Sequence, residues 1–81
     1  MEYPWKVVGY EHTCSEKGTE GIRLYVEQKL PPDVVGEGVV CARGWFNPSF
    51  VEYTPVLGDV VIIIPDERNR NIISRIIKIE I

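Results

Sequence analysis

Residues 21–29 read GIRLYVEQK, a stretch in which aliphatic side chains alternate with charged or aromatic ones from residue 22 to residue 27. Ile22, Leu24 and Val26 fall on one face of an extended chain, and the charged and aromatic side chains between them fall on the other. Strict alternation with a period of two is typical of a strand that is half buried and half in water. We therefore expect this strand to organise the fold.

Four further segments rich in Val, Ile, Tyr and Trp flank this stretch, and clusters of Gly, Pro, Asn and Asp separate them. Together they predict five strands, at residues 5–13, 21–29, 39–46, 59–65 and 72–81. No segment keeps the i, i+3, i+4 spacing of a helix over ten residues or more. Asn47 followed by Pro48 predicts at most one short helical turn within residues 47–53.

The length of 81 residues suits one domain, which we expect to span residues 1–81. Five short antiparallel strands in a chain of this size remove their exposed edges by curling and closing. The fold expected is all-β, a small five-stranded antiparallel barrel of OB-like type. An SH3-like barrel is the alternative.

The third expected strand, residues 39–46, alternates less clearly than the second. We expect Val40, Ala42 and Phe46 to face inward together with Gly44. The side chains between them, which include Cys41, Arg43 and Trp45, would then face outward.

The last two expected strands carry more aliphatic side chains than one small barrel can bury. Residues 60–64 read VVIII, with no alternation, as in a strand covered on both faces. In the last strand we expect Ile77, Ile79 and Ile81 to point inward, with a bulge that reorients Ile73. Because a strand hides one face in its own barrel, these patterns predict a homodimer through the fourth or fifth strand.

Composition excludes several classes of protein. Nine Lys and Arg against twelve Asp and Glu give a formal charge of −3, so the chain is no general polycation. The longest apolar run, residues 60–65, is far shorter than the ~20 residues that span a bilayer, so we expect no membrane partner. The first residues lack the pattern of a signal peptide, and two cysteines are few for a secreted scaffold. A cytoplasmic location is expected.

Residue spacings give no sign of metal or cofactor chemistry. His12 and Cys14 are two residues apart, but with Cys41 they do not form the ligand spacing of a zinc site. The glycine-rich stretches at residues 18–21 and 36–38 lack the Gly-Lys-Ser/Thr ending and the following helix of a phosphate-binding loop. We therefore expect no metal, no cofactor and no enzymatic activity.

An OB-fold binds its ligand across the outer face of strands two and three, between the loops that join strands one to two and four to five. Alternation places two arginines and two aromatic rings on that face, and the last loop adds two more arginines. The expected nucleic-acid-binding residues are Arg23, Tyr25, Arg43, Trp45, Arg68 and Arg70. Rings stack on bases and cations follow phosphates, which predicts a protein that binds single-stranded nucleic acid. A protein–protein interaction module that uses the same face, or an edge strand, to bind a host or phage protein is the alternative.

The layout also resembles a known family. It combines KGTEG at residues 17–21, GDVVI at residues 58–62 and a final strand with the spacing I-x-x-I-x-I. The chain resembles small β-barrel proteins of phages and integrative elements, and its length and strand count are similar to those of the filamentous-phage single-strand DNA-binding proteins. This resemblance implies an OB-like dimer that holds single-stranded DNA. The chain departs from that family in its acidic net charge.

Overall fold

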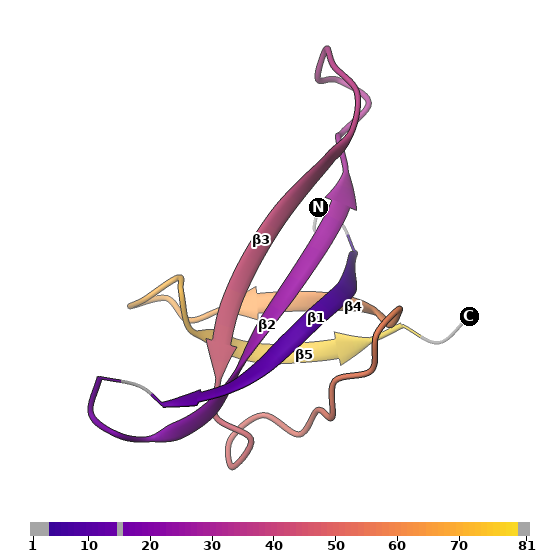
Figure 1. Cartoon of the computed structure of the whole chain (residues 1–81). Helices are drawn as coiled ribbons and strands as arrows, with labels where there is room; N and C mark the ends of the chain where they lie inside the picture. Colours follow the sequence, from indigo (N-terminus) through magenta and orange to yellow (C-terminus); the bar gives the residue numbers. More distant parts are fainter. Residues whose placement is uncertain (1–3, 15, 80–81) are drawn as a thin grey trace.

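A computed structural model describes residues 4–14 and 16–79 and contains five β-strands, with no helix among those residues (Figure 1). The strands are β1 (Trp5–Cys14), β2 (Glu20–Lys29), β3 (Val39–Phe46), β4 (Val60–Pro65) and β5 (Ile73–Lys78). They form one sheet in the order β3-β2-β1-β4-β5, and every neighbouring pair is antiparallel. The expected all-β fold with five antiparallel strands is confirmed, and each strand begins within one residue of its predicted start.

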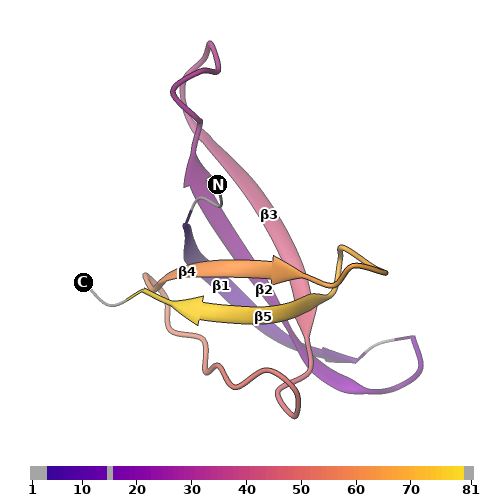
Figure 2. The same cartoon turned by 180° about the vertical axis from the view of Figure 1, so that it is seen from behind.

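The sheet is sharply bent, so that the β4–β5 hairpin lies across the long β1–β2–β3 meander (Figures 1 and 2). The pairing of β1 with β2 shifts between Val7 and Gly9, which leaves Val8 as an extra residue on β1. Such a bulge bends a strand and increases its twist. On one side of it, Trp5 and Lys6 pair with residues 60 and 61 of β4, while residues 9–14 of β1 pair with β2 alone.

The core lies between the inner face of the meander and the β4–β5 hairpin. Eight side chains are buried there: Val7, Ile22, Leu24, Val26, Phe46, Val51, Val61 and Ile73. The three inward residues expected from the alternation of residues 21–29 are all among them. Burial of these aliphatic and aromatic side chains is the main stabilising contribution to the fold.

The two end strands of the sheet, β3 and β5, meet at a single point. Trp45 and Ile72 form an isolated parallel bridge, in which the Trp45 N–H donates to the Asn71 carbonyl at 2.9 Å. The two strands approach closely there because Gly44 has no side chain. A Cβ on Gly44 would lie 2.7 Å from Cγ1 of Ile73. Beyond this bridge no described residues pair the two strands, so the sheet is not closed.

The β2–β3 hairpin extends well beyond the β4–β5 hairpin (Figure 1). Val40 and Ala42 share the inner face of β3 with Phe46, as expected, but both are exposed because no strand covers that end of the hairpin. Facing inward is therefore not enough for burial, and only Phe46 of the three is buried.

The inward residues of β5 also differ from the expectation. The pairing with β4 shifts so that Ser74 has no opposite residue, which turns both Ile73 and Ile76 toward the core. Ile77 is 37% exposed, so the prediction that it points inward is wrong. Ile79 is half-buried, and Ile81 lies outside the described residues.

The expected helical turn after β3 is a single hydrogen-bonded turn. The Asn47 carbonyl accepts from the N–H groups of Phe50 and Val51, and the Asn47 side chain accepts from the Ser49 N–H at 2.9 Å. This is the bonding of an N-cap whose helix does not continue.

The part of the chain that the structure describes holds no helix with the length and apolar composition needed to cross a membrane.

A polar contact fixes the segment between β3 and β4. The Tyr53 hydroxyl donates to Oδ2 of Asp59 at 2.8 Å, and Nζ of Lys78 lies 3.7 Å from Oδ1 of the same carboxylate. Burial, together with the hydrogen bond to Asp59, raises the pKa of Tyr53 from 10.0 to about 12. The folded state therefore holds the Tyr53 proton more tightly than the unfolded state does.

Replacing Tyr53 by phenylalanine tests this contact. The stability that the raised pKa contributes is complete below pH 10.0 and is lost as the pH rises to about 12. We expect Tyr53→Phe to lower the free energy of unfolding at pH 7 by about 1 kcal/mol, the value of one hydrogen bond. Urea denaturation should also show that stability falls less steeply above pH 10.0 in the variant. Identical curves for the two proteins would contradict this account.

A second prediction concerns assembly. Ile62 and Ile77 lie directly opposite each other on the outer side of the β4–β5 hairpin. We propose that a second copy of the chain covers this pair, and that Ile77→Glu disrupts the contact because it buries a charge. Sedimentation should give about twice the 9.3 kDa of one chain for the wild type and a monomer for the variant. A wild-type mass of 9.3 kDa at high concentration would exclude the dimer.

Candidate nucleic-acid interface

Four of the six residues expected to bind nucleic acid lie side by side on β2 and β3. Arg23 is directly opposite Trp45, and Tyr25 is directly opposite Arg43. Directly opposite residues of antiparallel strands point to the same face. These four side chains, together with Glu11 of β1, form what we call the outer face, on the side of the meander away from the core.

Trp45 is held on the outer face by close contact with Gly21. A Cβ on Gly21 would collide with the indole ring, so the ring covers the backbone where a side chain would otherwise stand. Gly21 is buried as a result. The indole Nε1 is also buried, and it has no hydrogen-bond partner among the described residues. Trp45 therefore combines a fixed ring with an unused donor.

An open groove of about 880 Å³ runs beside Trp45, between the β1–β2 loop and the β4–β5 loop. Both loops lie on the same side of the molecule, near the end of β3 (Figures 1 and 2). The aromatic residues of the groove are Trp45 and Phe50, and Phe50 is 85% exposed. Its charged lining consists of Lys17 and Arg23 against Glu16 and Asp66. The groove is therefore aromatic and balanced in charge.

The β4–β5 loop is shaped by its own side chains. Asp66 Oδ1 accepts from the Arg68 N–H at 2.8 Å, and Asn69 Oδ1 accepts from the Asn71 N–H at 3.0 Å. These are Asx turns, which fold a loop without help from the rest of the protein. They leave Arg68 and Arg70 exposed.

The six expected residues do not all line one cavity. Arg23 and Trp45 line the large groove. Arg43 and Arg70 line a separate cleft of about 350 Å³ next to the open part of the sheet. Tyr25 and Arg68 line neither. Alternation places the expected residues of β2 and β3 on one face, but because the sheet is bent, the expected residues line two separate cavities or neither.

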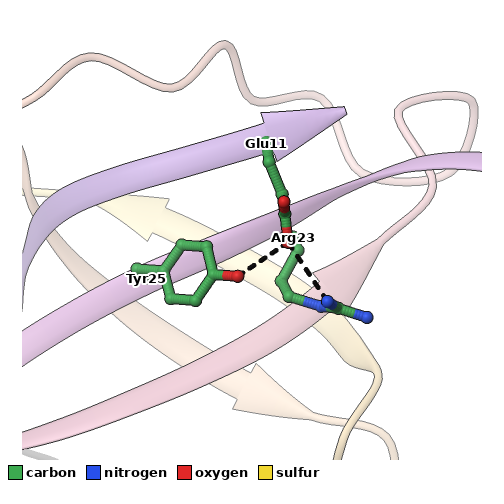
Figure 3. A network of polar contacts seen from close by, with 3 residues as sticks. All are labelled: Glu11, Arg23 and Tyr25. Carbon is green, nitrogen blue, oxygen red and sulfur yellow. Dashed lines mark hydrogen bonds and ion pairs between the residues drawn. The ribbon is translucent and has the colours of Figure 1, made fainter. Parts of the chain in front are cut away.

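Sequence analysis did not single out Glu11, which links two of the expected residues (Figure 3). Its Oε1 accepts from Nη1 of Arg23 at 3.1 Å and from the Tyr25 hydroxyl at 2.7 Å. The Tyr25 hydroxyl and the Arg23 guanidinium hold the pKa of Glu11 below its ordinary value. Predicting this contact requires the register of β1 against β2, which the turn between the two strands sets and which no motif in the sequence specifies.

The thiols and the histidine are separate from one another. Cys14 and Cys41 are both free and exposed, and Cys41 lies on the edge strand β3. The ring of His12 meets the edge of the Tyr10 ring at a centroid distance of 6.1 Å. Residues 4–14 and 16–79 contain no group of three or more His, Cys, Asp or Glu side chains able to hold a metal ion.

The contact between Gly21 and Trp45 generates a prediction. Gly21→Ala forces the indole ring away from the backbone, which we expect to shift the Trp45 emission and to cost roughly 1–3 kcal/mol of stability. The measurement uses a Trp5→Phe background, so that Trp45 is the only tryptophan. Gly9→Ala is the matched control, because a Cβ there lies an ordinary 3.8 Å from Tyr25. Equal effects of the two substitutions would contradict the close contact.

The chain was also compared with protein-family models, with curated protein sequences and with solved structures, and none of the three gave a match. No residue role is therefore carried over from a relative. The groove between the two loops, the fixed Trp45 ring and the linked polar side chains of the outer face are the features that point to a function.

Proposed function

We propose that this protein binds single-stranded nucleic acid, without catalysing a reaction, in the groove beside Trp45. The position of the groove carries the proposal. It lies at the end of the β2–β3 face and between the β1–β2 and β4–β5 loops. OB-folds bind oligonucleotides with the corresponding face and loops.

The strand connections support an OB-like barrel as part of this proposal. With the bridge from Trp45 to Ile72, the strands follow the circuit β1-β2-β3-β5-β4 and return to β1. The OB-fold is a five-stranded, partly open barrel, so an open seam between β3 and β5 is compatible with it. The proposal includes a phage or mobile-element origin, in line with the resemblance in length and strand count.

The composition of the groove favours stacking over charge as the source of affinity. Trp45 and Phe50 offer two rings, and an aromatic ring contributes about 1–3 kcal/mol for each base that stacks on it. Lys17 and Arg23 can each meet a phosphate, but Glu16 and Asp66 oppose them. We therefore expect binding that weakens only gradually with salt, by about 0.7 log units per log unit of salt for each phosphate neutralised.

Phe50 provides the cleanest test, because its 85% exposed ring contributes little to the core. Phe50→Ala should weaken binding of oligothymidylate by about 1–3 kcal/mol with no loss of thermal stability. Trp45 emission in the Trp5→Phe background measures the binding, at low salt and then at rising salt. Leu57→Ala is the control, since Leu57 is 62% exposed and lies outside the groove. If the wild type binds neither DNA nor RNA oligomers at low salt, the proposal fails.

A protein partner is the second candidate, and a different observation favours it. Residues 39–44 of β3 have no neighbour on their outer edge among the described strands. Residues 39–42, Val-Val-Cys-Ala, carry no charge. An edge of this kind accepts an added strand from another chain. Binding that is unaffected by Phe50→Ala but lost when Val40 is replaced by proline would favour this candidate.

A further inference from the structure

Two donors on the outer face converge on one oxygen atom. Nη1 of Arg23 and the hydroxyl of Tyr25 both donate to Oε1 of Glu11, at 3.1 Å and 2.7 Å (Figure 3). The donors come from one strand and the acceptor from its neighbour, with Glu11 directly opposite Arg23. A guanidinium and a hydroxyl placed around one anionic oxygen are the groups that also bind a phosphate oxygen.

Neither partner is sealed from solvent. The side chain of Arg23 is 39% exposed and that of Glu11 is 46% exposed. An ion pair with this exposure contributes little to folding stability, so a ligand can break it at small cost. Gly9, which lies opposite Tyr25 on β1, adds no side chain to cover the hydroxyl.

The same arginine connects this contact to the groove. Arg23 lines the groove beside Trp45, and Trp45 is its direct neighbour on β3. A strand of nucleic acid that stacks on Trp45 therefore brings its backbone next to the Arg23 guanidinium. The Glu11 carboxylate already occupies the position at which a phosphate oxygen would accept from Arg23 and Tyr25.

We infer that Arg23 and Tyr25 form a binding site for one backbone phosphate, and that the Glu11 carboxylate occupies this site in the free protein. This inference rests on the proposed binding of single-stranded nucleic acid. Glu11 is then an internal competitor, because the ligand must displace its carboxylate before the phosphate can bind. Glu11 holds the donors of Arg23 and Tyr25 in place, and at the same time it lowers the affinity of the protein for nucleic acid.

The test compares Glu11→Gln with Glu27→Gln. Both substitutions remove one negative charge from the outer face. Glu27 belongs to this face because it alternates with the inward residues of β2, and it lies opposite Lys6 on β1 and Cys41 on β3. Only Glu11 contacts the two donors. We expect Glu11→Gln to bind oligothymidylate about three- to tenfold more tightly than the wild type, because the ligand no longer has to displace an ion pair from Arg23. Glu27→Gln should change affinity by less than about twofold, because Glu27 contacts neither donor and a charge without such a contact acts only through the screened field.

A second ligand tests whether a charged phosphate is the group that binds Arg23 and Tyr25. In a methylphosphonate oligothymidylate the backbone carries no charge, so Glu11→Gln should bind this oligomer as the wild type does. The inference is overturned if Glu11→Gln binds the normal oligomer no more tightly than the wild type. It is also overturned if Glu27→Gln gives the same gain, or if the gain persists on the methylphosphonate oligomer. In each of these outcomes the wild type still binds, whereas absence of binding by all three proteins overturns the proposed function together with the inference.

Discussion

The hydrogen bond from the Trp45 N–H to the Asn71 carbonyl holds the two ends of the sheet together. A five-stranded sheet with this strand order would otherwise leave β3 and β5 apart, because neither pairs with the other along its length. Gly44 makes the contact possible, since it lets Ile73 pack directly against the backbone of β3. The buried core and the groove both depend on this meeting point, which sets β5 over the inner face and the β4–β5 loop beside the end of β3.

A second constraint is that the short β4–β5 hairpin cannot cover the whole inner face of the β2–β3 hairpin. The β4–β5 hairpin has two short strands, so it covers only one end of the longer β2–β3 hairpin. The uncovered end leaves Val40 and Ala42 of the inner face exposed and the edge of β3 unpaired. A small domain has little chain to cover such an edge, and an unpaired apolar edge is a place where another chain can bind. The groove beside Trp45 and this edge lie at opposite ends of β3.

The charges around the proposed interface match the acidic composition of the protein. Carboxylates lie among the cations at each place: Glu11 contacts Arg23, and Glu16 and Asp66 line the same groove as Lys17. The local field is therefore weak, and rings rather than charges offer the larger contribution to binding. Trp45 is suited to this role because its ring is held against Gly21 and needs no ordering when a base arrives.

The sequence by itself determined the five strands, the antiparallel arrangement, and the faces of β2 and β3. These follow from alternation and from glycine, proline and asparagine at the turns, which act over a few neighbouring residues. Asn47 and Pro48 likewise located the turn after β3. Only the tertiary structure decided which inward side chains are buried, as Val40 and Ala42 show, because burial depends on which strand lies across them. It also decided the partners of Arg23 and Tyr25, since the pairing of β1 with β2 places Glu11 opposite Arg23, and the register of two strands depends on the turn and the whole sheet rather than on the residues of one strand.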